Sequence, residues 1–154
     1  MHFLLLFSRK RVMYVVYNVD VARIGRQFDC LKICITVMHE LQDKAMDSLI
    51  NRFALARAIH ISIESIIDVG SVLIDGFIMR DPGGYADIIE ILEDESVISA
   101  GLSKEIRCLI QIRTKLVHDY TELEVEGIVP YRYKTHLLEL FMDSVSKYLE
   151  KELV

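Results

Sequence analysis

The chain contains few residues that interrupt helices: its 154 residues include only two prolines and seven glycines. Proline removes a backbone donor and glycine adds backbone freedom, so their scarcity permits long, unbroken helices. Long apolar runs are absent too. No segment approaches the roughly 20 consecutive apolar residues that a membrane-spanning helix requires. We therefore expect one helical domain with no membrane segment.

Positive charge is also in short supply, because the formal net charge is −5. This balance argues against broad, sequence-independent binding of nucleic acid, DNA included, which needs a basic face. A role on RNA would need a local basic site or a brief catalytic encounter. The three cysteines, Cys30, Cys34 and Cys108, are odd in number and lie within helical patterns. They indicate a reducing cytoplasm and no disulfide framework.

Several motifs that would imply a cofactor or metal are missing. Pro82-Gly83-Gly84 has no Lys-Ser/Thr after it, so it does not form a phosphate-binding loop. Cys30 and Cys34 are one helical turn apart but have no second ligand pair, and structural zinc usually draws on two. We expect no metal and no cofactor. His60, set among Ala58, Ile59 and Ile61, is interpreted as a core or interface histidine.

The first residues are predicted to lie outside the domain. Residues 2–7 are mostly apolar and residues 9–11 are basic, which imitates a signal peptide with the charges on the wrong side. We expect residues 1–12 to be an N-terminal extension and residues 13–154 to form the domain. The alternative is a short apolar arm that packs on the domain.

Apolar residues recur at helical spacing along the whole chain. The pattern predicts helices over about 21–42, with Asp20 as the cap, and over about 46–78, ending before Pro82. A short helix over 86–93 follows. Another runs from a cap at Ser99 or Ser103 to about 119, and the last opens near Gly127 and Pro130. The predicted fold is an all-α, up-and-down bundle of about five helices.

The second predicted helix carries a polar stripe that includes Arg57, Glu64 and Asp68. Isoleucines flank Glu64 and Asp68, so these carboxylates could line a cleft and orient an Arg or a His on another helix. The alternative is a solvated edge of an amphipathic helix. Two carboxylates without further ligands are a weak metal signal.

Arg113, His118 and Tyr120 stand near the end of the fourth predicted helix, next to Thr114 and Lys115. A guanidinium can hold a phosphodiester and an imidazole can move a proton near neutral pH. The spacing places Arg113 and His118 on roughly one side of a helix. The alternative is a helix end stabilised by basic groups.

The Arg-x4-His-x-Tyr motif, its place late in a long helix and the order of helices resemble the HepT family. These are toxins of HepT/MntA toxin–antitoxin pairs, within the HEPN group of helical domains. The segment from Val72 to Ile88 resembles the YutE-like branch of that family. The resemblance covers the chain from about Met13 to the end. It departs at Thr114, where family members often carry an amide side chain.

The resemblance implies a metal-independent endoribonuclease that works as a homodimer with two motif copies in one cleft. Arg113 would hold the phosphate, and His118 would act as general base or acid on RNA. Tyr120 would receive AMP from a minimal nucleotidyltransferase antitoxin similar to MntA. Thr114 and Lys115, with Glu64 and Asp68, are expected to line the cleft. The rival hypothesis is a non-catalytic module that binds a nucleotide or regulates a nucleotidyltransferase.

Overall fold

The computed structural model describes residues 17–122 and 125–153, so the expected extension over 1–12 lies outside the described residues. Within these ranges five α-helices follow one another: α1 (Val21–Glu40), α2 (Leu49–Gly76), α3 (Tyr85–Asp94), α4 (Ala100–Val117) and α5 (Thr135–Glu152). The described part contains no strand, so the all-α prediction is confirmed. None of the described helices is long and apolar enough to cross a membrane.

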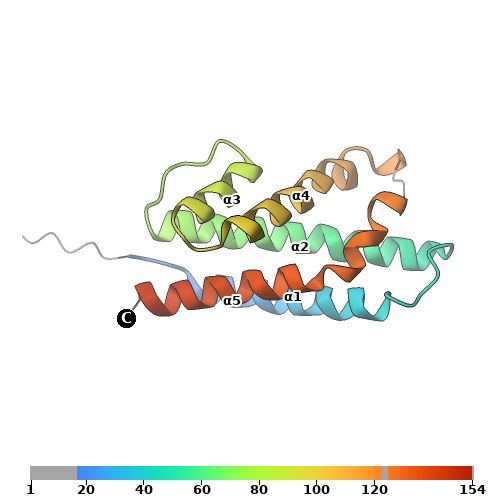
Figure 1. The fold of residues 1–154 in the computed structure, drawn as a ribbon, viewed down its shortest axis with the longest axis horizontal. Helices are drawn as coiled ribbons and strands as arrows, with labels where there is room; N and C mark the ends of the chain where they lie inside the picture. Colours follow the sequence, from blue (N-terminus) through green and yellow to red (C-terminus); the bar gives the residue numbers. More distant parts are fainter. Residues whose placement is uncertain (1–16, 123–124, 154) are drawn as a thin grey trace, which may run out of the picture.

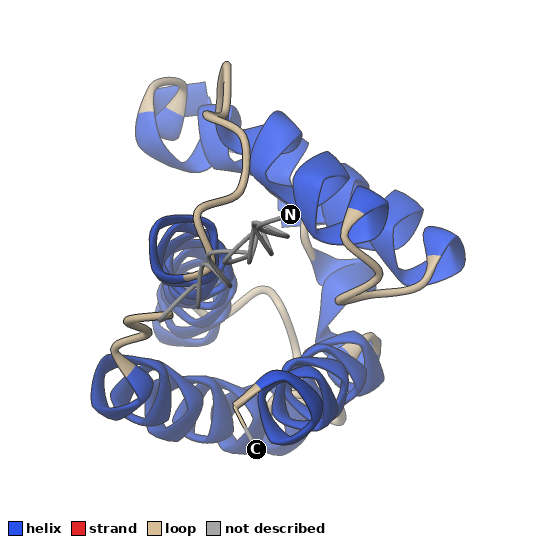
Figure 2. Ribbon diagram, turned by 90° about the vertical axis from the view of Figure 1, so that its left-hand side faces the viewer, coloured by secondary structure: helices blue, strands red, loops and turns tan. Residues whose placement is uncertain are grey.

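The longest helix, α2, is the centre of the bundle. In Figure 1, α1 and α5 lie on one side of α2, and α3 and α4 lie on the other. Figure 2 looks along the bundle and shows helices around a common interior. Apolar side chains from all five helices fill it, and most buried residues of α2 belong to it. A core of this extent is the main source of the stability of the fold.

Three helices begin at the capping residues that the sequence predicts or permits. The side chain of Asp20 accepts a hydrogen bond from the backbone N–H of Arg23 at 2.9 Å. Ser48 caps α2, and Ser99 caps α4 by accepting from Leu102 N–H at 3.2 Å. Each cap satisfies one of the donors that the first turn of a helix leaves free. Of the two serines proposed for α4, Ser99 is therefore the cap.

The end of α2 differs from the prediction, because the helix stops at Gly76 and does not reach residue 78. Ile78 adopts a left-handed conformation with φ 57°, and the Met79 N–H bonds back to the Ile74 carbonyl at 2.9 Å. This is the turn that usually closes a helix with glycine. The chain thus leaves α2 well before Pro82.

The last helix also begins later than the sequence suggested, at Thr135 and not near Gly127 and Pro130. Short 3₁₀ helices occupy 120–122, 125–127 and 129–133 instead. Arg132 Nη1 donates to the carbonyls of Leu41 and Lys44 at 3.1 and 3.0 Å. These bonds tie the 129–133 turn to the residues that directly follow α1.

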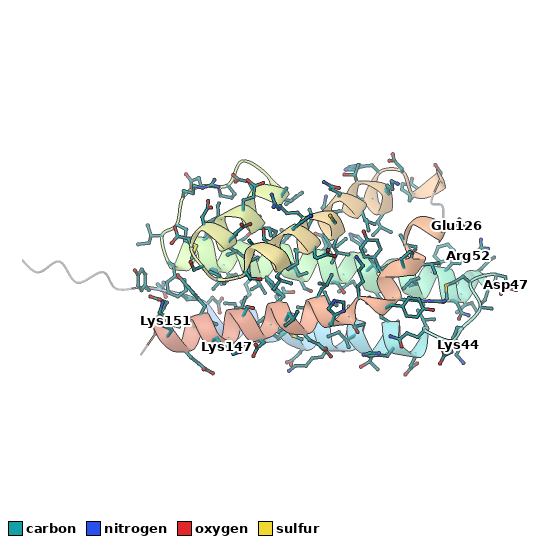
Figure 3. The ribbon with its side chains drawn as sticks, viewed as in Figure 1. Lys44, Asp47, Arg52, Glu126, Lys147 and Lys151 are labelled. Atoms are coloured by element: carbon teal, nitrogen blue, oxygen red, sulfur yellow. The ribbon has the colours of Figure 1, made fainter. Side chains whose placement is uncertain are left out.

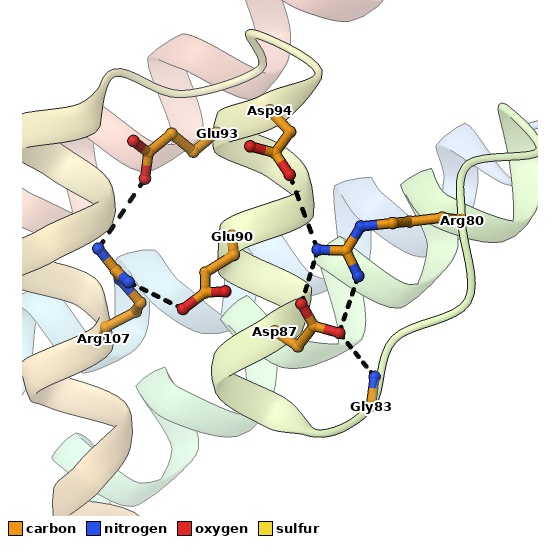
Figure 4. Close-up of polar contacts among 7 residues, drawn as sticks. All are labelled: Arg80, Gly83, Asp87, Glu90, Glu93, Asp94 and Arg107. Atoms are coloured by element: carbon orange, nitrogen blue, oxygen red, sulfur yellow. Dashed lines mark hydrogen bonds and ion pairs between the residues drawn. The ribbon is translucent and has the colours of Figure 1, made fainter.

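The close approach of α3 to α2 depends on Gly70. A Cβ at this position would lie 2.4 Å from Cγ2 of Ile88 on α3, closer than real contacts allow. Two arginines then hold α3 in place (Figure 4). Arg80 binds both carboxylate oxygens of Asp87, at 2.9 and 2.7 Å, and Arg107 on α4 binds Glu90 at 2.9 Å. These contacts position the first residue of α3, Tyr85, beside α4.

Candidate active site

Arg113 is the polar side chain that joins α4 to α2. It lies in the last turn but one of α4, and its Nε donates a hydrogen bond of 2.5 Å to Oε1 of Glu64 on α2. Its guanidinium carbon lies 4.5 Å from the centre of the Tyr85 ring. The side chain is only 20% exposed, against 42% for Glu64. A carboxylate and an aromatic face therefore fix the direction of the guanidinium group.

The hydrogen bond with Glu64 raises the pKa of Arg113 above its ordinary value. Burial acts in the opposite direction but is the smaller effect. Arg113 therefore carries a positive charge throughout the neutral pH range. The arrangement holds a permanent cation in place with part of its donor edge still available, as recognition of a phosphate requires.

Glu64 also has a neighbour on its own helix. His60 Nε2 lies 3.5 Å from the Glu64 oxygen that binds Arg113, and Arg57 Nη1 lies 3.3 Å from His60 Nδ1. Arg57 can only donate, so a hydrogen bond between these two atoms requires the His60 tautomer that accepts at Nδ1 and carries its proton on Nε2, facing Glu64. Arg57, His60 and Glu64 thus form a polar row that leads to Arg113.

The sequence interpretation missed His60 as part of this row, because its apolar neighbours suggested a core or interface histidine. The side chain is 25% exposed. The signal that could have found it is the spacing of Arg57, His60 and Glu64, three and four residues apart. This spacing places all three on one face of a helix. The proximity of Tyr85 to Arg113 had no signal in the sequence.

Asp68 lies one turn beyond Glu64 but has different partners. Its carboxylate accepts a hydrogen bond from Gln27 at 3.1 Å and lies 3.8 Å from Arg23, both on α1. Glu64 faces α4 and Asp68 faces α1. The structure thus brings Glu64, and not Asp68, to Arg113.

His118 and Tyr120 lie just beyond the last turn of α4. His118 is the C-cap, with its backbone N–H bonded to the Thr114 carbonyl at 2.8 Å, and its side chain is exposed. Thr114 and Lys115 are exposed too. Tyr120, in the 3₁₀ helix Tyr120–Glu122, is 68% exposed. Within the described ranges, no side-chain hydrogen bond or ion pair joins Arg113 to His118.

A pocket of about 410 Å³ opens beside Tyr120, between the first half of α2 and the end of α4. His60 lies in its wall and also contacts Glu64, so it connects the pocket to the Arg113–Glu64 pair. The full lining comprises Leu49, Arg52, Phe53, Ala56, Arg57, His60, Leu116, Tyr120 and Thr121. The side chain of Arg52 is labelled in Figure 3, at the amino-terminal end of α2.

Among the described residues, no group of three or more His, Cys, Asp or Glu side chains could hold a metal ion.

A family model for HepT-like ribonucleases matches residues 29–140 of this chain. The chain belongs to the HepT-like ribonuclease family. It is 37% identical to YutE of Bacillus subtilis (strain 168), a candidate RNase by its name, over 140 residues, 90% of this chain and 95% of that protein. The solved structure of YutE, described as a cytosolic protein of unknown function, superposes with a TM-score of 0.79, covering 90% of this chain and 96% of that one.

Solved structures of lower sequence identity share the fold. A tri-AMPylated HEPN toxin of Shewanella oneidensis, in complex with an MNT antitoxin, matches with a TM-score of 0.74 at 19% identity, over 81% of this chain and 97% of that one. A toxin–antitoxin complex with AMP-PNP matches with a TM-score of 0.76 at 18% identity, over 82% of this chain and 98% of the matched chain. These likenesses support the HEPN-type arrangement of helices that the sequence resemblance implied.

Proposed function

We propose that this HepT-like protein is the toxin of a HepT/MntA-type toxin–antitoxin pair and cleaves RNA as a homodimer in the cytoplasm. The observation that carries the proposal is the fixed Arg113 side chain. Glu64 and Tyr85 hold it beside the end of α4, where His118 and Tyr120 lie exposed. A charged donor with a set direction, and an accessible imidazole five residues further along the chain, are groups suited to phosphodiester chemistry.

The reaction requires no nucleophile from the protein, because RNA supplies its 2′-hydroxyl. His118 would take the proton of the 2′-hydroxyl while the 2′-oxygen attacks the neighbouring phosphorus. The 2′-O–P bond forms, the P–O5′ bond breaks, and the 5′-oxygen receives a proton. Arg113 would stabilise the charge that develops on the phosphoryl oxygens. In a homodimer, the His118 side chains of the two copies could serve as base and acid.

Tyr120 is the proposed point of control. Its exposed hydroxyl is available to a nucleotidyltransferase antitoxin, as AMP addition requires. The phenolic oxygen would attack the α-phosphorus of ATP, forming an O–P bond while pyrophosphate leaves, and the phenolic proton would pass to a base of the antitoxin. The anionic product would repel the phosphates of RNA. AMP addition to the Shewanella relative is consistent with this proposal.

Purified protein tests the proposal directly. We expect it to cleave RNA in the presence of EDTA, and Arg113→Ala and His118→Ala each to abolish both cleavage and growth arrest on overexpression. Tyr120→Phe should remain toxic when the antitoxin is co-expressed, whereas the wild type should be neutralised. A harmless wild type that cuts no RNA would contradict the proposal. It would favour the rival hypothesis of a non-catalytic module that binds a nucleotide.

A further inference from the structure

The pocket beside Tyr120 has an apolar wall that the fold leaves uncovered. Phe53 is 75% exposed and Leu49 is 67% exposed, although both belong to the central helix α2. Ala56, one turn further on, and Leu116 on α4 complete this wall. Small-molecule sites are typically hollows lined mostly by apolar side chains. The wall therefore calls for a ligand with an apolar face, and the ring of Phe53 favours a planar one.

The edge of the same pocket is cationic. Arg52 and Arg57 both line it. Arg52 Nε donates to the Met46 carbonyl, and Arg57 Nη1 contacts His60 Nδ1 at 3.3 Å. Within the described part of the chain, neither is in salt-bridge contact with a carboxylate, unlike the arginines that position α3 and the site. In a chain with a net charge of −5, these guanidinium groups make a local site for an anion.

We propose that this pocket binds a single nucleotide unit, with its base against Phe53 and its phosphate towards Arg57. A base supplies the planar apolar face, and stacking on an aromatic side chain stabilises it whatever its sequence. A phosphate is an anion that guanidinium groups recognise through paired hydrogen bonds. The volume of about 410 Å³ is within the usual range of small-ligand sites.

The identity of the nucleotide, and only that, rests on the proposed function. Tyr120 lines the pocket, so an adenylate attached to its hydroxyl would be next to Phe53 and Arg57 without free diffusion. A nucleotide of an RNA substrate beside the cleaved bond would meet the same groups. If both sources use the pocket, the adenylate of Tyr120 acts as an intramolecular competitor of RNA. Inactivation would then combine occlusion with charge repulsion.

The absence of tryptophan from the chain allows a direct test. Phe53→Trp places one fluorescent indole in the pocket at a largely exposed position. We expect free AMP to quench this fluorescence with saturation, and Arg57→Gln in the same background to weaken AMP binding by about tenfold, as the loss of one charge-assisted contact predicts. The matched control is Ile33→Trp on α1, which is 65% exposed and outside the pocket, and which AMP should leave unchanged.

Two further measurements identify the source. Quenching in protein that carries AMP on Tyr120, without free nucleotide, assigns the pocket to the adenylate. Quenching by a short single-stranded oligoribonucleotide bound to Phe53→Trp protein that also carries His118→Ala, which keeps the phosphate contact of Arg113 but blocks cleavage, assigns it to RNA. Wild-type protein provides a check free of the new indole: AMP should shift the backbone amide resonances of Phe53 and Arg57 and not that of Ile33.

Fluorescence that changes on dilution of the protein but not with AMP or RNA would overturn the proposal, because a second copy of the chain would then cover Phe53. The outcome is separable from that of the proposed function. AMP binding without RNA cleavage or AMP addition would support the pocket and contradict the toxin. RNA cleavage without any fluorescence response at residue 53 would support the toxin and contradict the pocket.

Discussion

The Nε of Arg113 donates to Oε1 of Glu64 across the contact between α4 and α2, at 2.5 Å. This bond connects the Arg-x4-His-x-Tyr motif to a helix that lies about 50 residues earlier in the chain. It also places a carboxylate between Arg113 and His60, whose Nε2 is 3.5 Å from the same oxygen. The direction of the guanidinium group therefore depends on α2 as much as on α4.

Glu64→Gln should impair RNA cleavage without unfolding the protein. The amide oxygen can still accept from Arg113 but carries no charge, so the guanidinium group is held less firmly. Loss of a charge-assisted hydrogen bond costs about 1.5–3 kcal/mol. Because Glu64 is partly exposed, we expect the low end, about a tenfold fall in kcat/KM. The measurement is the cleavage rate of a labelled RNA, with the thermal midpoint as a check on folding.

Asp68→Asn is the matched control, because Asp68 lies on the same helix and binds Gln27 and Arg23 of α1. We expect its kcat/KM and its pH profile to stay within about twofold of the wild type, an allowance for weak coupling through α2. A shifted pH profile in Asp68→Asn, together with an unchanged one in Glu64→Gln, would contradict this division of the two carboxylates.

Gly70→Ala should destabilise the protein by about 1–3 kcal/mol, because the added Cβ would overlap Cγ2 of Ile88 and push α3 away from α2. Ile88→Ala removes that methyl group, so the double variant should lose less stability than the sum of the single changes. Gly25→Ala on α1 is the control: nothing lies within 4 Å of its Cβ, and we expect a gain of about 0.5–1 kcal/mol. Urea denaturation measures all four variants.

Ile78→Gly should stabilise the protein by about 1 kcal/mol. The left-handed conformation at φ 57° strains a β-branched residue, and glycine adopts it freely, although glycine also makes the unfolded chain more flexible. Ile78→Ala retains a Cβ and should show no comparable gain. An equal gain in both variants, measured by urea denaturation, would point to the loss of the exposed side chain and not to relief of strain.

The ion pair between Asp87 and Arg80 should make the stability of the protein depend on pH in the acidic range. Hydrogen bonds from Arg80, and then from the Gly83 N–H, lower the pKa of Asp87 from 3.8 to about 2. Because the pKa of Asp87 is lower in the folded state than in the unfolded state, the ionised carboxylate stabilises the fold. This stabilisation is complete above about pH 4 and is lost as the pH falls towards 2. Asp87→Asn should therefore be less stable than the wild type at neutral pH, with a difference that narrows between pH 4 and pH 2.

Asp94→Asn serves as the control for this measurement, because Asp94 is more exposed and lies 3.7 Å from Arg80 without a hydrogen bond (Figure 4). We expect its difference from the wild type to be small at every pH. A difference for Asp87→Asn that stays constant from pH 7 to pH 2 would show that the carboxylate charge does not contribute.

The positions of the helix ends show how far the sequence could be interpreted. Asp20 and Ser99 cap α1 and α4 as predicted, because a cap depends on residues within one turn. The start of α5 was predicted too early: residues 129–133 form a 3₁₀ helix, and its Arg132 binds carbonyls that lie about 90 residues earlier, a contact that no local pattern specifies. The end of α2 was predicted too late, because a left-handed isoleucine has no signal in the sequence.

The sequence by itself determined the all-α fold, since helical periodicity follows from which residues must be buried. The sequence also identified the motif residues Arg113, His118 and Tyr120. For Glu64 and Asp68 it left two alternatives, a place in a cleft or on a solvated helix edge. Only the tertiary structure decided which partner each of these two carboxylates has. Helix α2 packs between α1 and α4, so carboxylates one turn apart face different partners: Glu64 meets Arg113, and Asp68 meets Gln27. The contact of Tyr85 with Arg113 likewise depends on the crossing of α3 at Gly70, which no local pattern specifies.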